Sequence, residues 1–164
     1  MKDLPGWLPK VTVWAVTFTV VFLAVLAWQH HREATRWAID GTQVEIRRSA
    51  DGHWHWPGRI NGREVDFLID TGATGSAIPG ALARELGLPV VGTVRSRTAG
   101  GEVRADVVLA DLSLQGGLRA ERLRVAALPE LAVPLLGLDV LGRLGWRQQD
   151  GVLRIDLRGQ PAAR

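Results

Sequence analysis

The chain of 164 residues contains no cysteine at all. Without cysteine it can carry no disulfide framework, no cysteine-based zinc site, no iron–sulfur cluster and no thiol nucleophile. At this length the chain holds one domain of ordinary size, or one small domain plus an anchor. A two-lobed enzyme with a duplicated active site does not fit.

The sequence also lacks an excess of charge of one sign. Lys+Arg 20 against Asp+Glu 17 gives a net charge of +3, and the basic residues are scattered rather than gathered in a stripe. We therefore expect no nucleic-acid partner. The sequence has no phosphate-binding glycine loop and no dinucleotide fingerprint, so we expect no cofactor. A content of 46% hydrophobic and 23% charged residues is typical of a folded chain rather than a disordered one.

One long hydrophobic run is present, from Val11 to Trp28, and it contains no charged residue. As a helix, this stretch of 18 residues would rise about 27 Å, enough to cross a thin hydrocarbon core. Trp7 and Trp28 flank the run, as interfacial aromatics do. We expect a transmembrane anchor at 11–28 after an N-terminal tail at 1–10. The alternative is a cleaved signal peptide, because Val25-Leu26-Ala27 is an acceptable cleavage site.

The charges around this run leave its orientation open. Lys2 and Lys10 precede it, and Arg32 and Arg36 follow it, so the positive charges are nearly balanced. An anchor or a signal normally sends the domain that follows it across the membrane, and we expect the same here. Residues 29–41 indicate a linker.

From Thr42 onward, short alternating strands are separated by turn signals. Asp51-Gly52, Asn61-Gly62 and Asp150-Gly151 are hairpin dipeptides, and we expect strands at 42–48 and 53–60 to pair around the first of them. Residues 79–86 form the only convincing helix, and a further short helix at 139–144 is compatible with the pattern. Many short strands with one short helix predict a mainly β fold, a small closed β-barrel over 42–158, with a C-terminal tail at 159–164.

The motif that carries chemistry is Asp70-Thr71-Gly72, whose aspartate ends the apolar strand 65–70. An aspartate in that position is expensive to ionise without partners. The alternative is an Asx-turn, in which Asp70 bonds its own backbone. The surrounding sequence makes this short motif more specific, because a second apolar strand, Leu135-Leu136-Gly137, ends 65 residues after Gly72.

Three blocks in order resemble the retropepsin-like aspartic proteases, in particular the bacterial branch with a membrane-anchored N-terminus. The blocks are GHWHWPGRINGREVDFLIDTGATGSAIP (52–79), RTAGGEVRADVVL (97–109) and LLGLDVLGRLG (135–145). The resemblance covers about 42–158. It implies a closed β-barrel of the retropepsin type that works as a homodimer and hydrolyses peptide or protein substrates as an aspartic endopeptidase. With the anchor at 11–28 it implies a single-pass protein of the bacterial inner membrane, and the orientation expected above puts the protease domain on the periplasmic side.

The resemblance assigns catalysis to Asp70, Thr71 and Gly72, with no metal. Two carboxylates sharing one proton activate one water in this chemistry. Each chain offers one motif, so the second Asp70 must come from a second chain, with the site on the twofold axis. Thr71 would hydrogen-bond the partner's loop, and Gly72 would present its N–H to the carboxylate. Leu135, Leu136 and Gly137 would pack behind the catalytic loop.

A second implication of the resemblance concerns the hairpin around Ala99, Gly100 and Gly101. It would be a flap that closes over the substrate and excludes water. The alternative is an ordinary surface hairpin. The glycine pair favours mobility and backbone contact with an extended peptide.

Rival sites are weaker. His53 and His55 share one face of a strand, but a metal site needs a third ligand and no carboxylate is fixed nearby, so we expect a solvated face. Asp139 is expected to be a helix N-cap rather than the second acid of an intramolecular dyad, since no Thr-Gly follows it. Two rival functions stay open: a non-catalytic peptide- or protein-binding module on the same barrel, and a structural membrane protein.

Overall fold

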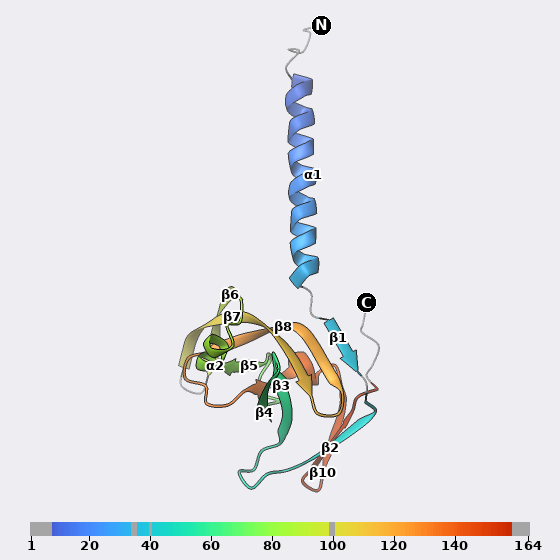
Figure 1. Cartoon of the computed structure of the whole chain (residues 1–164), viewed down its shortest axis with the longest axis vertical. Coiled ribbons are helices and arrows are strands. Elements are labelled where there is room, and N and C mark those ends of the chain that lie inside the picture. The colour runs from blue at the N-terminus through green and yellow to red at the C-terminus, as the bar shows by residue number, and fades with distance from the viewer. Residues whose placement is uncertain (1–7, 34–35, 40, 99–100, 159–164) are drawn as a thin grey trace. The chain divides into compact units, whose positions relative to one another are not determined.

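A computed structural model describes residues 8–33, 36–39, 41–98 and 101–158. The chain divides into two units between residues 34 and 35, and each is described by itself. The first contains the helix α1 (Leu8–Glu33), drawn in blue in Figure 1. The hydroxyls of Thr17 and Thr19 donate to the backbone oxygens four residues earlier, at 2.8 and 2.9 Å. These polar side chains are therefore satisfied within the helix itself.

Helix α1 contains the whole hydrophobic run 11–28 and is exposed from Val13 to Leu26. Within the part of the chain that the structure describes, no helix meets the length and hydropathy required of a membrane span. The anchor expected at 11–28 stays a prediction. Among the residues expected as a linker, α1 continues to Glu33 and the strand β1 (Arg36–Ile39) pairs with the barrel.

The second unit is a closed, mainly β barrel, as predicted. Its large sheet has the strand order β1-β8-β5-β9-β4-β3-β7-β6, and an additional pairing between β8 and β7 closes a ring of six strands (Figure 1). The ring strands are β3 (His55–Ile60), β4 (Arg63–Ile69), β5 (Ala77–Pro79), β7 (Gly101–Leu114), β8 (Leu118–Leu128) and β9 (Leu135–Leu136). Strand β6 (Val90–Thr98) extends the sheet beyond β7, and β1 extends it beyond β8.

A separate three-stranded sheet has the order β10-β11-β2. It consists of β2 (Gln43–Arg47), β10 (Gly145–Gln149) and β11 (Val152–Asp156). The expected hairpin of 42–48 with 53–60 is wrong, because β2 pairs with β11, which sets Val44 opposite Ile155. The reason is that both edges of β3 are taken, by β4 along its length and by β7 at its end. The Asp51-Gly52 turn still forms, closed by a 2.8 Å bond from the Ser49 N–H to the His53 oxygen.

The barrel carries two short helices rather than one. Helix α2 (Gly80–Glu85) is the predicted one, and α3 (Leu138–Leu141) follows β9. The N-cap of α3 is Gly137, whose oxygen accepts the Leu141 N–H at 3.0 Å. Asp139 therefore lies in the first turn of α3, and the prediction that it caps the helix is wrong.

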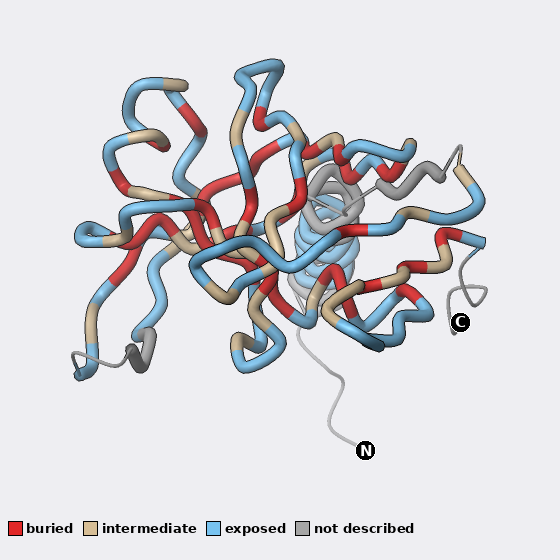
Figure 2. The backbone as a smooth tube through the Cα atoms, turned by 90° about the horizontal axis from the view of Figure 1, so that it is seen from below, coloured by how far each residue is buried: buried red, intermediate tan, exposed pale blue. Residues whose placement is uncertain are grey.

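The main hydrophobic core fills the barrel. Buried residues alternate with exposed ones along its strands, as the red and blue segments in Figure 2 show. Trp56 on β3 and Phe67 on β4 stand opposite each other and are both 0% exposed. The Trp56 indole N–H donates to the Gln115 oxygen at 2.8 Å. This pair fixes β3 against β4, the strand that leads into Asp70.

Candidate active site

Asp70 stands where β4 leaves the barrel core. The buried Ile69 precedes it, and the Asp70 N–H donates to the Leu136 oxygen at 3.0 Å. Strands β4 and β9 run parallel, with Ile69 in register with Leu136. The Leu135-Leu136 strand thus lies beside the loop, as predicted, and fixes the backbone from which the carboxylate projects.

The loop after Asp70 turns back on the carboxylate. The Gly72 N–H donates to Asp70 Oδ1 at 2.8 Å, the bond that the resemblance implied. This bond is also the Asx-turn that was the alternative interpretation, so the same geometry fits both predictions. A Cβ at position 72 would lie only 3.2 Å from Asp70 Oδ1, which favours glycine there. Asp70 is half-buried, whereas Thr71 and Gly72 are exposed at the tip of the loop.

The start of α3 presses against the same loop from behind. A Cβ on the buried Gly137 would lie 2.5 Å from the backbone carbon of Gly75 and 3.0 Å from the Ala73 oxygen. The Leu138 N–H donates to that Ala73 oxygen at 2.9 Å. This approach is possible only without a side chain at position 137, so Gly137 packs behind the loop as predicted.

The expected flap hairpin is present as β6 and β7, paired antiparallel to Thr98↔Gly101. Gly101 begins β7 at φ +115, a conformation that favours glycine. Ala99 and Gly100 lie outside the described residues. That the hairpin acts as a flap stays a prediction.

The sequence did not predict a second, small hydrophobic cluster that connects this hairpin to the strand after the loop. Ala105 on β7 forms a small buried cluster with Ala77 on β5 and Leu128 on β8, and Val103 and Leu135 pack against it. The cluster joins the hairpin to β5, which follows the Asp70 loop, and to β9, which lies beside it. The alternation of Val103 and Ala105 shows that they share a face of β7, but not which strands that face meets.

The histidines behave differently from each other. His53 is exposed, as expected, but carboxylates do lie beside His55, contrary to the prediction. Its Nε2 is 2.7 Å from Asp51 Oδ2, and its Nδ1 is 3.3 Å from Asp66 Oδ2. Over the described ranges, no group of three or more His, Cys, Asp or Glu residues is placed to hold a metal ion. His55 instead links the turn at Asp51 to strand β4.

This turn should make the fold sensitive to acid. Hydrogen bonds from the His53 N–H and then the His55 ring lower the pKa of the Asp51 carboxyl. A carboxyl with a lower pKa in the folded state stabilises the fold above its unfolded pKa, and the contribution is lost as the pH falls through the folded pKa. We expect the Tm of the full chain to decrease as the pH is lowered below about 4. In Asp51→Asn this decrease of Tm with falling pH should be smaller. Tm measured against pH tests this, with Asp150→Asn on an exposed turn as control; identical profiles for wild type and Asp51→Asn would contradict it.

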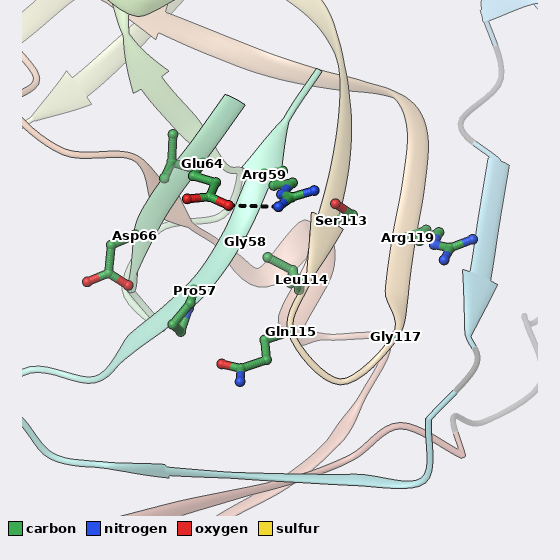
Figure 3. Close-up of a pocket in the computed structure, with 11 residues that line it drawn as sticks. Pro57, Gly58, Arg59, Glu64, Asp66, Ser113, Leu114, Gln115, Gly117 and Arg119 are labelled. Carbon is green, nitrogen blue, oxygen red and sulfur yellow. Dashed lines mark hydrogen bonds and ion pairs between the residues drawn. The ribbon is translucent and has the colours of Figure 1, made fainter. Parts of the chain in front are cut away.

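A hollow of about 940 Å³ is lined by residues of β3, β4, β7, β8 and the turn between β7 and β8 (Figure 3). Arg59 of β3 and Glu64 of β4 form an ion pair of 2.7 Å on one side of it, and Arg119 of β8 lies on the other side. Asp70 is not among the residues that line it. The hollow is therefore distinct from the candidate active site.

Comparison with known proteins defines the class. The sequence profile described as aspartyl protease matches residues 56–145, more than half of the chain. The chain belongs to the aspartyl protease family. This match contains the Asp70-Thr71-Gly72 loop, the hairpin and α3.

The chain is also similar to one uncharacterized protein and to several solved structures. An uncharacterized protein of Rickettsia prowazekii (strain Madrid E) is 26% identical over 156 residues, which are 87% of this chain and 68% of that protein. The crystal structure of a retropepsin-like aspartic protease from Rickettsia conorii superposes with a TM-score of 0.54 at 22% identity, over 75% of this chain and 93% of that one. EIAV protease in complex with an inhibitor gives a TM-score of 0.48 at 23% identity, over 57% of this chain and 89% of that one. The likeness to the Rickettsia conorii structure confirms the retropepsin-like fold.

Proposed function

We propose that this chain is an aspartic endopeptidase whose active site forms from two copies of Asp70 across a homodimer. The observation that carries the proposal is the Asp70 loop, in which a half-buried carboxylate accepts the Gly72 N–H beside an exposed tip. Membership of the aspartyl protease family supports the reaction class. One chain has one Asp-Thr-Gly, so the loop is half of a site.

The mechanism requires the two carboxylates to differ in protonation. The ionised one takes a proton from a water, whose oxygen attacks the peptide carbonyl carbon. The protonated one donates its proton to the carbonyl oxygen, and the amine leaves with a proton when the tetrahedral intermediate collapses. Carboxylates about 3 Å apart cannot both ionise, so they titrate as a pair. Thr71 steadies the partner's loop, and the β6–β7 hairpin covers the substrate.

We also propose that the chain is single-pass in the bacterial inner membrane, anchored through 11–28, with the protease domain on the periplasmic side. The uncharged run and its flanking tryptophans support this. Confinement in a membrane raises the effective concentration of the copies, which favours a weak dimer. Recovery of the full chain in the membrane fraction after alkaline extraction tests the anchor, and recovery in the soluble fraction would contradict it.

Mixing wild type with Asp70→Asn tests the shared site. At a fixed amount of wild-type full-length chain, an equal amount of the variant should lower hydrolysis of a mixed peptide library to about half, and a threefold excess to about a quarter. The reason is that the probability that a wild-type chain pairs with a second wild-type chain equals the wild-type share of all chains present.

The outcomes of mixing separate the alternatives. An unchanged rate at every ratio, with subunit exchange verified by differently tagged chains, would mean that one copy suffices. No hydrolysis by wild type alone would instead favour a peptide-binding module.

A further inference from the structure

Asp139 is an acidic side chain that the proposed mechanism does not use, yet three donors converge on its carboxylate. Asp139 Oδ2 accepts the Ser76 N–H at 3.0 Å, and Oδ1 accepts the Ser76 hydroxyl at 2.7 Å. The Val140 N–H also donates to Oδ1, at 2.9 Å. Ser76 is 3% exposed and lies 63 positions away in the sequence. The half-buried carboxylate therefore joins two distant segments through a buried serine.

These two segments are the candidate catalytic loop and the segment packed behind it. Ser76 ends the loop that begins at Asp70, and its Oγ accepts the Gly137 N–H at 3.1 Å. Gly137 follows Leu136, whose oxygen accepts the Asp70 N–H at 3.0 Å. The chain of bonds from Asp139 through Ser76 and Gly137 thus reaches the residue that holds the Asp70 backbone.

We infer that Asp139 is a positioning residue for the proposed reaction, which acts by fixing the 70–76 loop so that Asp70 meets its copy in a productive geometry. The inference rests on the proposed function. A displacement of about 1 Å in a reacting group costs up to about 100-fold in rate, so a loop held at both ends matters for catalysis and not only for folding.

The geometry requires a carboxylate rather than an amide. Both oxygens of Asp139 face backbone N–H groups, of Ser76 on one side and Val140 on the other. Asparagine has one acceptor oxygen and one NH₂ group. In either orientation Asp139→Asn would set its NH₂ against a backbone N–H, and the bond there would be lost.

The test compares Asp139→Asn, Ser76→Ala and the double variant in the full chain. Because bonds to charged groups contribute most, we expect each single change to lower kcat about 10- to 100-fold and to leave KM within about twofold. The double variant should be no slower than the slower single one, since both changes break the same connection. Asp150→Asn makes the same charge change on an exposed turn and should match wild type. Wild-type kcat in Asp139→Asn, or losses that multiply in the double variant, would overturn the inference.

A second readout is independent of peptide hydrolysis. Hydrogen exchange of the peptide that covers 70–76 should accelerate in Asp139→Asn and Ser76→Ala but not in Asp150→Asn. If the wild-type chain hydrolyses no peptide, the proposed function is wrong. If hydrogen exchange of 70–76 is unchanged in both variants, the positioning role of Asp139 is wrong, whatever the outcome for hydrolysis. If Asp139→Asn does not fold, Ser76→Ala decides, since it keeps the carboxylate and removes only the hydroxyl.

Discussion

Asp70→Asn is expected to lower kcat/KM for peptide hydrolysis by about 100- to 10,000-fold, the range that a positioned acid or base contributes. The amide has the shape of the carboxylate but can neither take a proton from water nor hold one for the carbonyl oxygen. Its oxygen can still accept the Gly72 N–H, so the loop should keep its conformation. Initial rates of the full chain on a mixed peptide library measure the effect.

The matched control for this change is Asp150→Asn. Asp150 is exposed in the β10–β11 turn at φ +51, a conformation that asparagine adopts readily. The Asp150→Asn substitution removes one negative charge, as Asp70→Asn does, and we expect this variant to hydrolyse peptides at the wild-type rate. Cleavage that survives Asp70→Asn at the wild-type rate would refute the assignment of Asp70.

The second large effect is on stability. Trp56→Ala is expected to lower the free energy of unfolding by about 3–5 kcal/mol, because it empties the position opposite Phe67 in the middle of the barrel. Urea unfolding of the full chain, followed by circular dichroism of the β domain, measures the loss.

Trp56→Phe separates packing from hydrogen bonding at the same position. It keeps an aromatic ring in the core and removes the indole N–H that donates to the Gln115 oxygen. We expect a loss of about 1–3 kcal/mol, smaller than for alanine. Equal losses for the two variants would mean that the hydrogen bond, rather than the filled volume, accounts for the effect of Trp56→Ala.

The barrel could be predicted from sequence because its turns are chemically local. Asn61 at φ +47 and Gly62 at φ +86 form the tight turn between β3 and β4, and Asp150 and Gly151 do the same between β10 and β11. Such dipeptides favour the left-handed conformations that a two-residue hairpin needs. Strand pairing across long separations has no such signal, which is why the pairing of β2 with β11 was missed.

In the candidate site, too, the contacts that are local in sequence could be predicted and those between distant segments could not. The Gly72 N–H bond to Asp70 closes within three residues and was expected. Asp139 was singled out in the sequence but given the role of a helix cap, since a capping preference is local. Its actual contact, Ser76, becomes visible only when β9 and α3 are placed behind the loop. His55 was misjudged only partly for a similar reason: Asp66 reaches it from the neighbouring strand, but Asp51, the nearer carboxylate, lies four residues away in the sequence.

The parallel pairing of β4 with β9 has a consequence for biosynthesis. Asp70 is translated long before Leu136, whose oxygen holds its backbone, and before Gly137, which packs beneath its loop. A nascent chain that has left the ribosome only as far as the hairpin carries the motif without its support. The Asp70 loop therefore gains this support only after residues 136 and 137 have emerged, so in the proposed protease the synthesis of the motif would precede the ability to cut.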